Sequence, residues 1–124
     1  MPQLTFPVTR VGLSAPVWIG LDGKTTTALV TAGQPVAAPV QARGLVDTGS
    51  DVSVVASWVL QRYEVSLSIT DPGQAGSPWL TQPDLVVMEL PASLPDVDVL
   101  IGLDVLLNCR FLLDGPGRQL TFDF

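Results

Sequence analysis

The sequence predicts an all-β domain: a small closed β-barrel or sandwich with at most one short helix. Apolar runs have the length of strands, turn signals return about every ten residues, and the eleven glycines and eleven prolines are spread along the chain. That spread indicates turns between short strands rather than a linker. The chain has 124 residues, 47% of them hydrophobic, so we expect residues 1–124 to form one domain with a closed core.

The first half of the chain contains the strands that lead to the candidate site. Leu4, Phe6 and Val8 alternate with other residues, which predicts an edge strand. The stretch VWIGLDGKTTTALV is interpreted as two strands joined at Asp22-Gly23, because Asp-Gly between β-rich runs is a strong hairpin signal. VQARGLV predicts a further strand that runs directly into the sequence DTGS.

The second half begins with ITDPGQAGSPWL, whose glycines and prolines are typical of a long hairpin tip. DLVVMEL predicts the next strand. LPDVDVLIGLDVLLNC predicts a buried strand, a glycine and a short helix near residues 103–109, with Asp104 as its cap. FLLDGPGRQLTFDF predicts a closing hairpin with its turn at DGPG.

Composition excludes several classes of function. The formal net charge is −6 and the six basic residues are scattered, so no cationic stripe for nucleic acid is expected. The chain has no histidine, which excludes Ser-His-Asp and Cys-His sites and any zinc site that needs imidazole. Asp96 and Asp98 flank Val97 and are expected at a solvated strand edge rather than at a metal. We expect no metal and no cofactor.

The single cysteine, Cys109, rules out an intrachain disulfide and favours a reducing, cytoplasmic location. No apolar run approaches the length of a membrane span, and the N-terminus lacks the basic start and apolar core of a signal peptide. A membrane anchor outside this chain stays an open alternative.

The segment RGLVDTGSDVSVV raises a chemical question, because Asp47 directly follows an apolar strand. A lone buried carboxylate costs several kcal/mol unless a neighbour compensates it. Two carboxyl groups about 3 Å apart can share one proton, and such a pair hydrolyses a peptide bond without a metal or a covalent nucleophile. Only one D-T-G occurs, so the second carboxylate must come from a second copy of the chain. The alternative is a turn aspartate that accepts from backbone amides.

These residues also carry a family resemblance. LVDTGSDVSVV resembles the active-site motif of the retropepsins, the single-domain aspartic proteases that work as homodimers. VLIGLDVL resembles their second motif, two apolar residues and a glycine beneath the active-site loop, followed by a short helix. The sequence of this second motif resembles the cellular and bacterial retropepsin-like domains more than the viral enzymes. The resemblance implies a retropepsin-type barrel, a two-fold symmetric homodimer, a polypeptide substrate and no cofactor.

The resemblance assigns a role to each residue of the first motif. Asp47 matches the catalytic aspartate, and Thr48 matches the residue that bonds across the two-fold axis to the partner loop. Gly49 allows close approach of the substrate backbone. Ser50 stands where many viral enzymes have alanine; a hydroxyl that donates to the carboxylate favours its charged form and predicts an acidic pH optimum. Asp51 matches a position that contacts the substrate main chain.

In the second motif, Gly102 matches the glycine that packs beneath the active-site loop. In viral relatives an arginine follows this glycine and pairs with the aspartate at the position of Asp51. This chain has Leu103 there, so the partner of Asp51 is left open.

A flap that closes over substrate is expected at about Ile69–Leu80. Gly73 and Gly76 would be its flexible points, and Trp79 would either cover the substrate or pack in the core. Trp58 is expected to fill the core or an interface.

Two functions follow from these observations. The first is an aspartic endopeptidase that cleaves extended polypeptides, and the second is a catalytically silent retropepsin-like module for dimerisation or peptide binding. The chain is also compatible with a protease domain cut from a larger protein. The closing strand QLTFDF and the N-terminal LTFPV are expected to pair between subunits.

Overall fold

The computed structural model describes residues 1–60, 62–90 and 94–124. Ten strands and two helices follow one another along these residues, and their order is β1 (Gln3–Pro7), β2 (Ser14–Leu21), α1 (Gly23–Thr31), β3 (Val40–Val46), β4 (Val54–Ala56), β5 (Glu64–Ile69), β6 (Leu80–Val86), β7 (Met88–Leu90), β8 (Val99–Ile101), α2 (Leu103–Leu106), β9 (Arg110–Asp114) and β10 (Gln119–Asp123).

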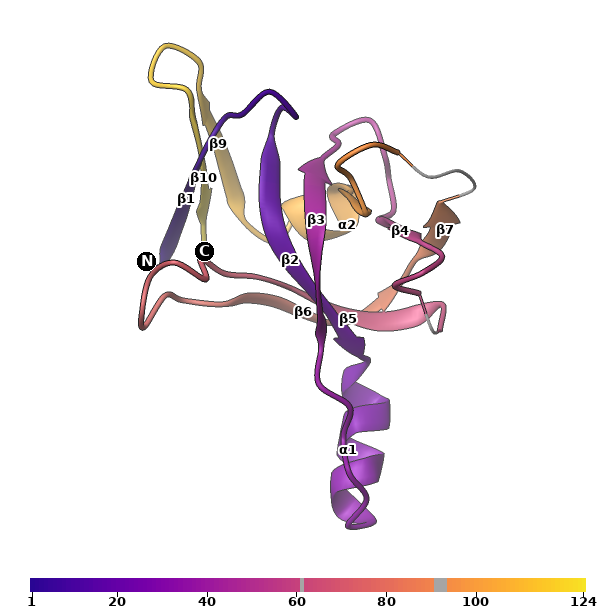
Figure 1. Cartoon of the computed structure of the whole chain (residues 1–124). Coiled ribbons are helices and arrows are strands. Elements are labelled where there is room, and N and C mark those ends of the chain that lie inside the picture. The colour runs from indigo at the N-terminus through magenta and orange to yellow at the C-terminus, as the bar shows by residue number, and fades with distance from the viewer. Residues whose placement is uncertain (61, 91–93) are drawn as a thin grey trace.

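The strands form two sheets. Seven lie in the order β6-β5-β2-β3-β8-β4-β7, and three lie in the order β1-β10-β9. Figure 1 shows the larger sheet curling into a half-barrel, with the smaller sheet at the upper left. The predicted all-β class is therefore confirmed. Within the larger sheet, β3 and β8 run parallel while β3 and β2 run antiparallel.

The core forms because the strands alternate buried and exposed residues. β2 and β5 bury every second side chain, and Val17 and Leu67 have no exposed surface. Aromatic rings fill the smaller sheet, where Phe6 and Phe111 pack on Phe122 with ring centroids 6.1 and 5.5 Å away. Phe122 belongs to the same hydrophobic cluster as Val17 and Leu67, so both sheets share one core. Burying each large apolar side chain contributes about 1.5–3 kcal/mol.

The hairpin predicted at Asp22-Gly23 is wrong, because its second strand, KTTTALV, lies in helix α1. The Asp22 carboxylate accepts from the Thr25 N–H at 3.1 Å and caps the helix. Hydrogen bonds from Thr25 lower the pKa of Asp22. Strand β2 pairs instead with β3, with Trp18 opposite Gln41. Helix α1 is thus inserted between two paired strands, projects from the body in Figure 1 and has no buried residue.

Helix α2 is confirmed but is shorter than the predicted range 103–109. Its cap residue is Gly102, which makes no side-chain cap hydrogen bond. The expectation that Asp104 caps the helix is wrong, because its carboxylate accepts from Ser53 instead. In the described ranges, neither helix has the length and apolar character needed to cross a membrane.

The closing hairpin is confirmed as β9 and β10, but its pairing differs from the expectation. QLTFDF pairs with LTFPV of its own chain, with Leu4 opposite Phe122, and β9 occupies the other side of β10. Strand β10 thus has a neighbour on both edges within one chain. A partner subunit cannot add to β10 unless it displaces β1 or β9.

Candidate active site

The two motifs lie side by side because they follow parallel neighbouring strands. Val46 is opposite Ile101 in the β3–β8 register, and the Asp47 N–H donates to the Ile101 carbonyl at 2.9 Å. Parallel strands that end together bring the segments beyond them to one edge of a sheet. The structure therefore places Asp47 and Gly102 together, beyond the end of β3 at the top centre of Figure 1.

Gly102 lies so close to the Asp47 loop that a side chain would not fit. A Cβ at this position would stand 2.7 Å from the carbonyl carbon and oxygen of Val52 and 2.8 Å from the Ser50 carbonyl oxygen. Its φ of −91° is ordinary, so the requirement is for space and not for glycine's conformational freedom. The next residue, Leu103, donates its N–H to the Ser50 carbonyl at 2.8 Å. These backbone contacts hold the Asp47 loop against the second motif.

A buried serine adds a side-chain connection that the sequence reasoning missed. Ser53 has no exposed surface. Its N–H and hydroxyl donate to the Asp104 carboxylate at 2.9 and 2.7 Å, and its hydroxyl oxygen accepts from the Gly102 N–H at 3.0 Å. A polar residue within the apolar run VSVV was the available signal. This network joins the loop after Asp47 to the start of α2.

The Asp47 carboxylate is half-buried rather than fully buried. Its Oδ1 accepts from the Gly49 N–H at 3.0 Å, the bond of an Asx turn. Within the described ranges, no other group donates to this carboxylate. Thr48 and Gly49 are exposed in the single chain. The carboxylate therefore keeps most of its hydrogen-bonding capacity for a group outside the chain.

Ser50 makes a different hydrogen bond from the one expected, whereas the role of Asp51 stays a prediction. The Ser50 hydroxyl donates to the Val52 carbonyl at 2.6 Å and not to the Asp47 carboxylate. The prediction of an acidic pH optimum from a Ser50–Asp47 hydrogen bond is therefore wrong for the single chain. Asp51 is exposed, and its carbonyl accepts from the Asp104 N–H at 3.2 Å. Among the described residues, no cation pairs with the Asp51 carboxylate.

The glycine-rich segment is a hairpin loop, as expected, but the structure does not bring it to Asp47. It joins β5 to β6, and Figure 1 shows it at the left near the two chain termini, away from the end of β3. Gly73 and Gly76 are exposed within it. Trp79 packs on Trp18 of β2, with ring centroids 5.3 Å apart. The flap role of these residues stays a prediction.

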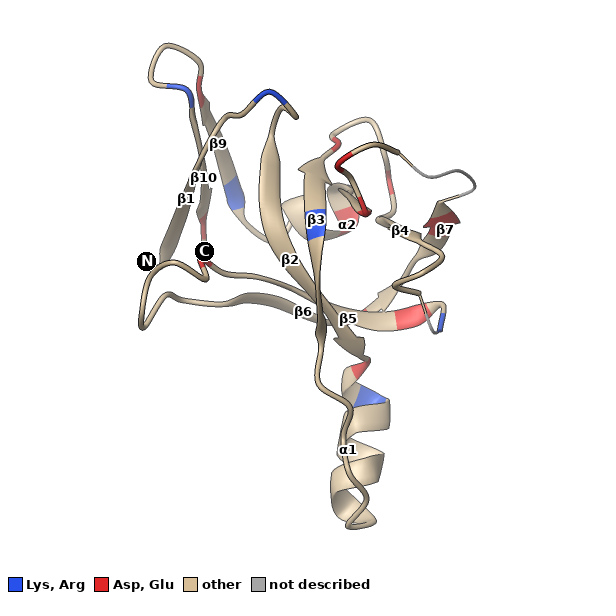
Figure 2. Ribbon diagram, viewed as in Figure 1, with Lys and Arg blue, Asp and Glu red and all other residues tan. Residues whose placement is uncertain are grey.

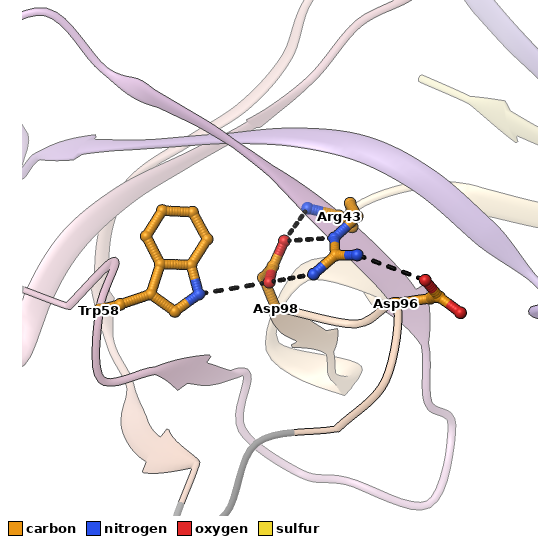
Figure 3. A network of polar contacts seen from close by, with 4 residues as sticks. All are labelled: Arg43, Trp58, Asp96 and Asp98. Carbon is orange, nitrogen blue, oxygen red and sulfur yellow. Dashed lines mark hydrogen bonds and ion pairs between the residues drawn. The ribbon is translucent and has the colours of Figure 1, made fainter.

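A second carboxylate cluster lies beside the middle of β3 and the start of β8 (Figure 3). Asp98 is 3% exposed and accepts from Arg43 three times, from Nε at 2.9 Å, Nη2 at 3.0 Å and the N–H at 2.8 Å. The Trp58 indole also donates to it at 3.3 Å. Asp96 is exposed and reaches Arg43 Nη1 at 3.5 Å. The hydrogen bonds from Arg43 lower the pKa of Asp98 and raise that of the guanidinium.

This cluster corrects two expectations. Asp98 is buried in an ion pair and not at a solvated strand edge, whereas Asp96 is exposed as expected. Trp58 does not fill the core, because 63% of its surface is exposed. In the described parts of the chain, no group of three His, Cys, Asp or Glu side chains converges as a metal site.

The same residues line a groove of about 820 Å³, whose walls include Arg43, Trp58 and Asp96. Ala42, Gly44 and Val46 of β3 point into the core, so Arg43 faces the opposite side. Continued by one residue, this alternation puts Asp47 on the face of Arg43. The two positions differ by four in number, which is about 13 Å along an extended chain. The groove is therefore an extension of the face that carries Asp47. Its apolar wall comes from Phe6, Pro7, Val11 and Pro16.

Charges are distributed as the sequence predicted. Figure 2 shows the blue basic segments scattered over the fold, whereas several of the red acidic segments gather around the upper ends of β3 and β4. No cationic surface for a polyanion is formed by the described residues. The face beside Asp47 is acidic.

Comparisons with known proteins give the fold an independent identification. No family model matches the chain, and no curated protein matches it. Among solved structures, it is similar to the crystal structure of a retropepsin-like aspartic protease from Rickettsia conorii, with a TM-score of 0.54 and 12% sequence identity. The match covers 97% of this chain and 89% of that one. Over nearly its whole length, the chain thus has the fold of a retropepsin-like aspartic protease.

Proposed function

We propose that the chain is an aspartic endopeptidase that works as a homodimer, with one Asp47 from each subunit. The observation that supports this most strongly is the position of Asp47, on a loop fixed against Gly102 beyond the parallel pair β3 and β8 of a retropepsin-like fold. Its carboxylate has one internal hydrogen bond, from Gly49. A carboxylate so placed is available to a second copy.

In the dimer, the two Asp47 carboxyl groups lie about 3 Å apart and share one proton. The ionised member takes a proton from a water molecule as the water attacks the carbonyl carbon. The protonated member donates a hydrogen bond to the carbonyl oxygen and later supplies a proton to the leaving amine. Since the pair titrates as a unit, it is active where it holds one proton, which gives an acidic optimum.

The substrate lies as an extended strand on the face shared by Asp47 and Arg43. Gly49 and Asp51 lie in the Asp47 loop and would contact its backbone. At about 3.3 Å per residue, a side chain three or four positions from the cleaved bond reaches the groove beside Trp58. Closure by Gly73, Gly76 and Trp79 requires their loop to move, or to reach the site from the partner subunit.

Two finer assignments belong to the same proposal. The sequence IGLDVL resembles the cellular and bacterial retropepsin-like domains more than the viral enzymes. The single cysteine favours a cytoplasmic location.

The direct test compares two matched substitutions. Asp47→Asn should abolish cleavage of a denatured protein at about pH 4–6 while the fold is retained. Asp84→Asn is the control, because the Asp84 carboxylate also accepts from a backbone N–H, that of Lys24 at 3.4 Å, and lies outside the Asp47 loop and the glycine-rich loop. It should leave cleavage unchanged. Undiminished cleavage by the Asp47 variant would disprove the assignment.

A silent peptide-binding module is the second candidate, and two observations favour it. Among the described residues the Asp51 carboxylate has no cationic partner, and the glycine-rich loop lies away from Asp47. A statine peptide, which mimics the tetrahedral intermediate, separates the candidates. The protease predicts inhibition of measurable turnover, whereas the module predicts peptide binding with no turnover at any pH.

A further inference from the structure

The groove beside Arg43 reaches toward Asp47 along one face of the sheet. Its lining includes Ser14 of β2 as well as Arg43 of β3. Ser14 lies opposite Leu45 in the β2–β3 register, and strand alternation places Leu45 between Arg43 and Asp47 on the same face of β3. A peptide strand bound at Asp47 can therefore continue directly into the groove.

The lining of the groove divides into an apolar part and a charged part. The apolar part includes Pro7 of β1 and Val11 in the segment that follows β1, and Val11 is 38% exposed. The charged part consists of Arg43, Asp96 and Asp98. A long side chain with an aliphatic stem and a charged end matches this lining, because the stem packs on apolar atoms while the end pairs with a charge.

The sign of the charged part decides which side chain fits. Asp98 neutralises Arg43, because it accepts from Nε at 2.9 Å and from Nη2 at 3.0 Å. Asp96 adds a second carboxylate, which lies 3.5 Å from Nη1 while 69% of its side chain stays exposed. In the described part of the chain no other ionisable side chain lines the groove, and the neighbouring Arg10 does not. One guanidinium and two carboxylates leave a net negative charge.

A turn holds the Asp96 carboxylate at the groove. Leu94 and Val97 form a bridge, so Pro95 and Asp96 are the central residues of the turn between them. Asp96 has a φ of 60°, a left-handed conformation that aspartate and asparagine adopt more readily than most residues. Figure 3 shows the Trp58 indole on the opposite side of Arg43. The carboxylate is therefore fixed by its backbone and open to a ligand.

We infer that this groove binds a lysine or arginine side chain of the substrate, about four residues or fewer from the cleaved bond, and that Asp96 determines the preference. The inference rests on the proposed function and names its substrate class, polypeptides that are basic beside the cleaved bond. The cationic end pairs with Oδ2 of Asp96, since Oδ1 faces Arg43, and the stem packs on Val11 and Pro7. The net charge of −6 attracts the same substrates at longer range.

The test measures this preference as a ratio of kcat/KM values. A peptide that the chain cleaves, taken from a randomised synthetic library, is remade with lysine or glutamate at each position near the cleaved bond. At one position lysine should exceed glutamate by about five- to tenfold, because one is attracted and the other repelled. In Asp96→Asn, which keeps the turn because asparagine tolerates a positive φ, the ratio should fall below about twofold.

Asp84→Asn is the matched control, because Asp84 is exposed, lies outside the lining of the groove and carries the same charge. Its ratio should equal that of the original chain. Salt provides a measurement that needs no variant: raising the ionic strength from about 0.05 M to about 0.5 M should bring the ratio of the original chain toward one, since exposed charge pairs are screened.

The outcomes separate this inference from the proposed function. Equal cleavage of the two peptides, a preference for glutamate, or an unchanged ratio in folded Asp96→Asn would overturn the inference and leave the protease standing. If the chain cleaves no peptide, the library is passed over the immobilised chain. Retention of lysine and arginine peptides that Asp96→Asn loses would support the groove and count against the protease, whereas retention without that preference, or none, would overturn both.

Discussion

Two regions on one face of β3 hold a carboxylate in opposite ways. Beside the middle of the strand, Asp98 is buried and receives three hydrogen bonds from Arg43 and one from Trp58. Beyond its end, the half-buried Asp47 receives one, from Gly49. An anion whose lone pairs are occupied by fixed donors is part of the structure, whereas one with free lone pairs can take part in a reaction.

The two regions also differ in what fixes them. The Asp47 loop is held through backbone contacts around Gly102 and through hydrogen bonds from Ser53 to the Asp104 carboxylate, without an ion pair among the described residues. The Asp98 region is held by an ion pair between side chains. Substitutions and pH should therefore affect the two regions differently, and the following experiments separate them.

Gly102→Ala should produce the largest loss in stability. The new methyl group would stand 2.7 Å from the Val52 carbonyl, and relieving that overlap should cost about 3 kcal/mol or more and displace the Asp47 loop. Chemical denaturation and cleavage assays measure the two effects. Gly115→Ala is the control, since no atom lies within 4 Å of its Cβ position. Equal stability of the two variants would contradict the close packing described for Gly102.

Asp98→Ala should lower the free energy of unfolding by about 2–3 kcal/mol, because it removes hydrogen bonds to a charged group and leaves Arg43 without its buried partner. The loss of stability is no larger than this because Arg43 is largely exposed to solvent. Asp47→Asn, by contrast, should change stability by less than about 0.5 kcal/mol while abolishing cleavage. The distinction between the two carboxylates fails if both variants lose stability equally.

Acid should weaken the Asp98 region in particular. Because Arg43 lowers the pKa of Asp98 below its usual 3.8 in the folded chain, the pair stabilises the fold above about pH 4 and loses this effect as pH falls through the lowered pKa. The stability difference between the original chain and Asp98→Asn should therefore shrink as the pH falls from the usual pKa of 3.8 through the lowered pKa of Asp98. A difference that stays constant over that interval would mean that the pair does not act through charge.

The sequence predicted those features that depend on residues close together in the chain. Asp47, Gly102 and the strands before them are marked by contiguous motifs, and the structure places them together. The Arg43–Asp98 pair joins residues 55 positions apart, and neither residue has a distinctive neighbour pattern. Ser53 was missed for the same reason, because its partner Asp104 is 51 positions away.

One wrong prediction and one that stays a prediction come from residues that serve several structures. Asp22-Gly23 suits a hairpin turn, but the same aspartate is a good helix cap, and the capped helix α1 forms there. In the segment with Gly73 and Gly76, glycine and proline predict a loop without indicating what the loop covers. That position is set by the pairing of β5 and β6 with the rest of the sheet.

The central claim is that one site needs Asp47 from two chains, and mixing subunits tests it most directly. The original chain is mixed with an equal amount of Asp47→Asn and allowed to exchange at a concentration at which both dimerise. If both carboxylates are required, half of the dimers are mixed and inactive, so activity falls to about a quarter of that of the same total amount of original chain. Activity of about one half would contradict the account, because each chain would then cleave with its own Asp47 alone.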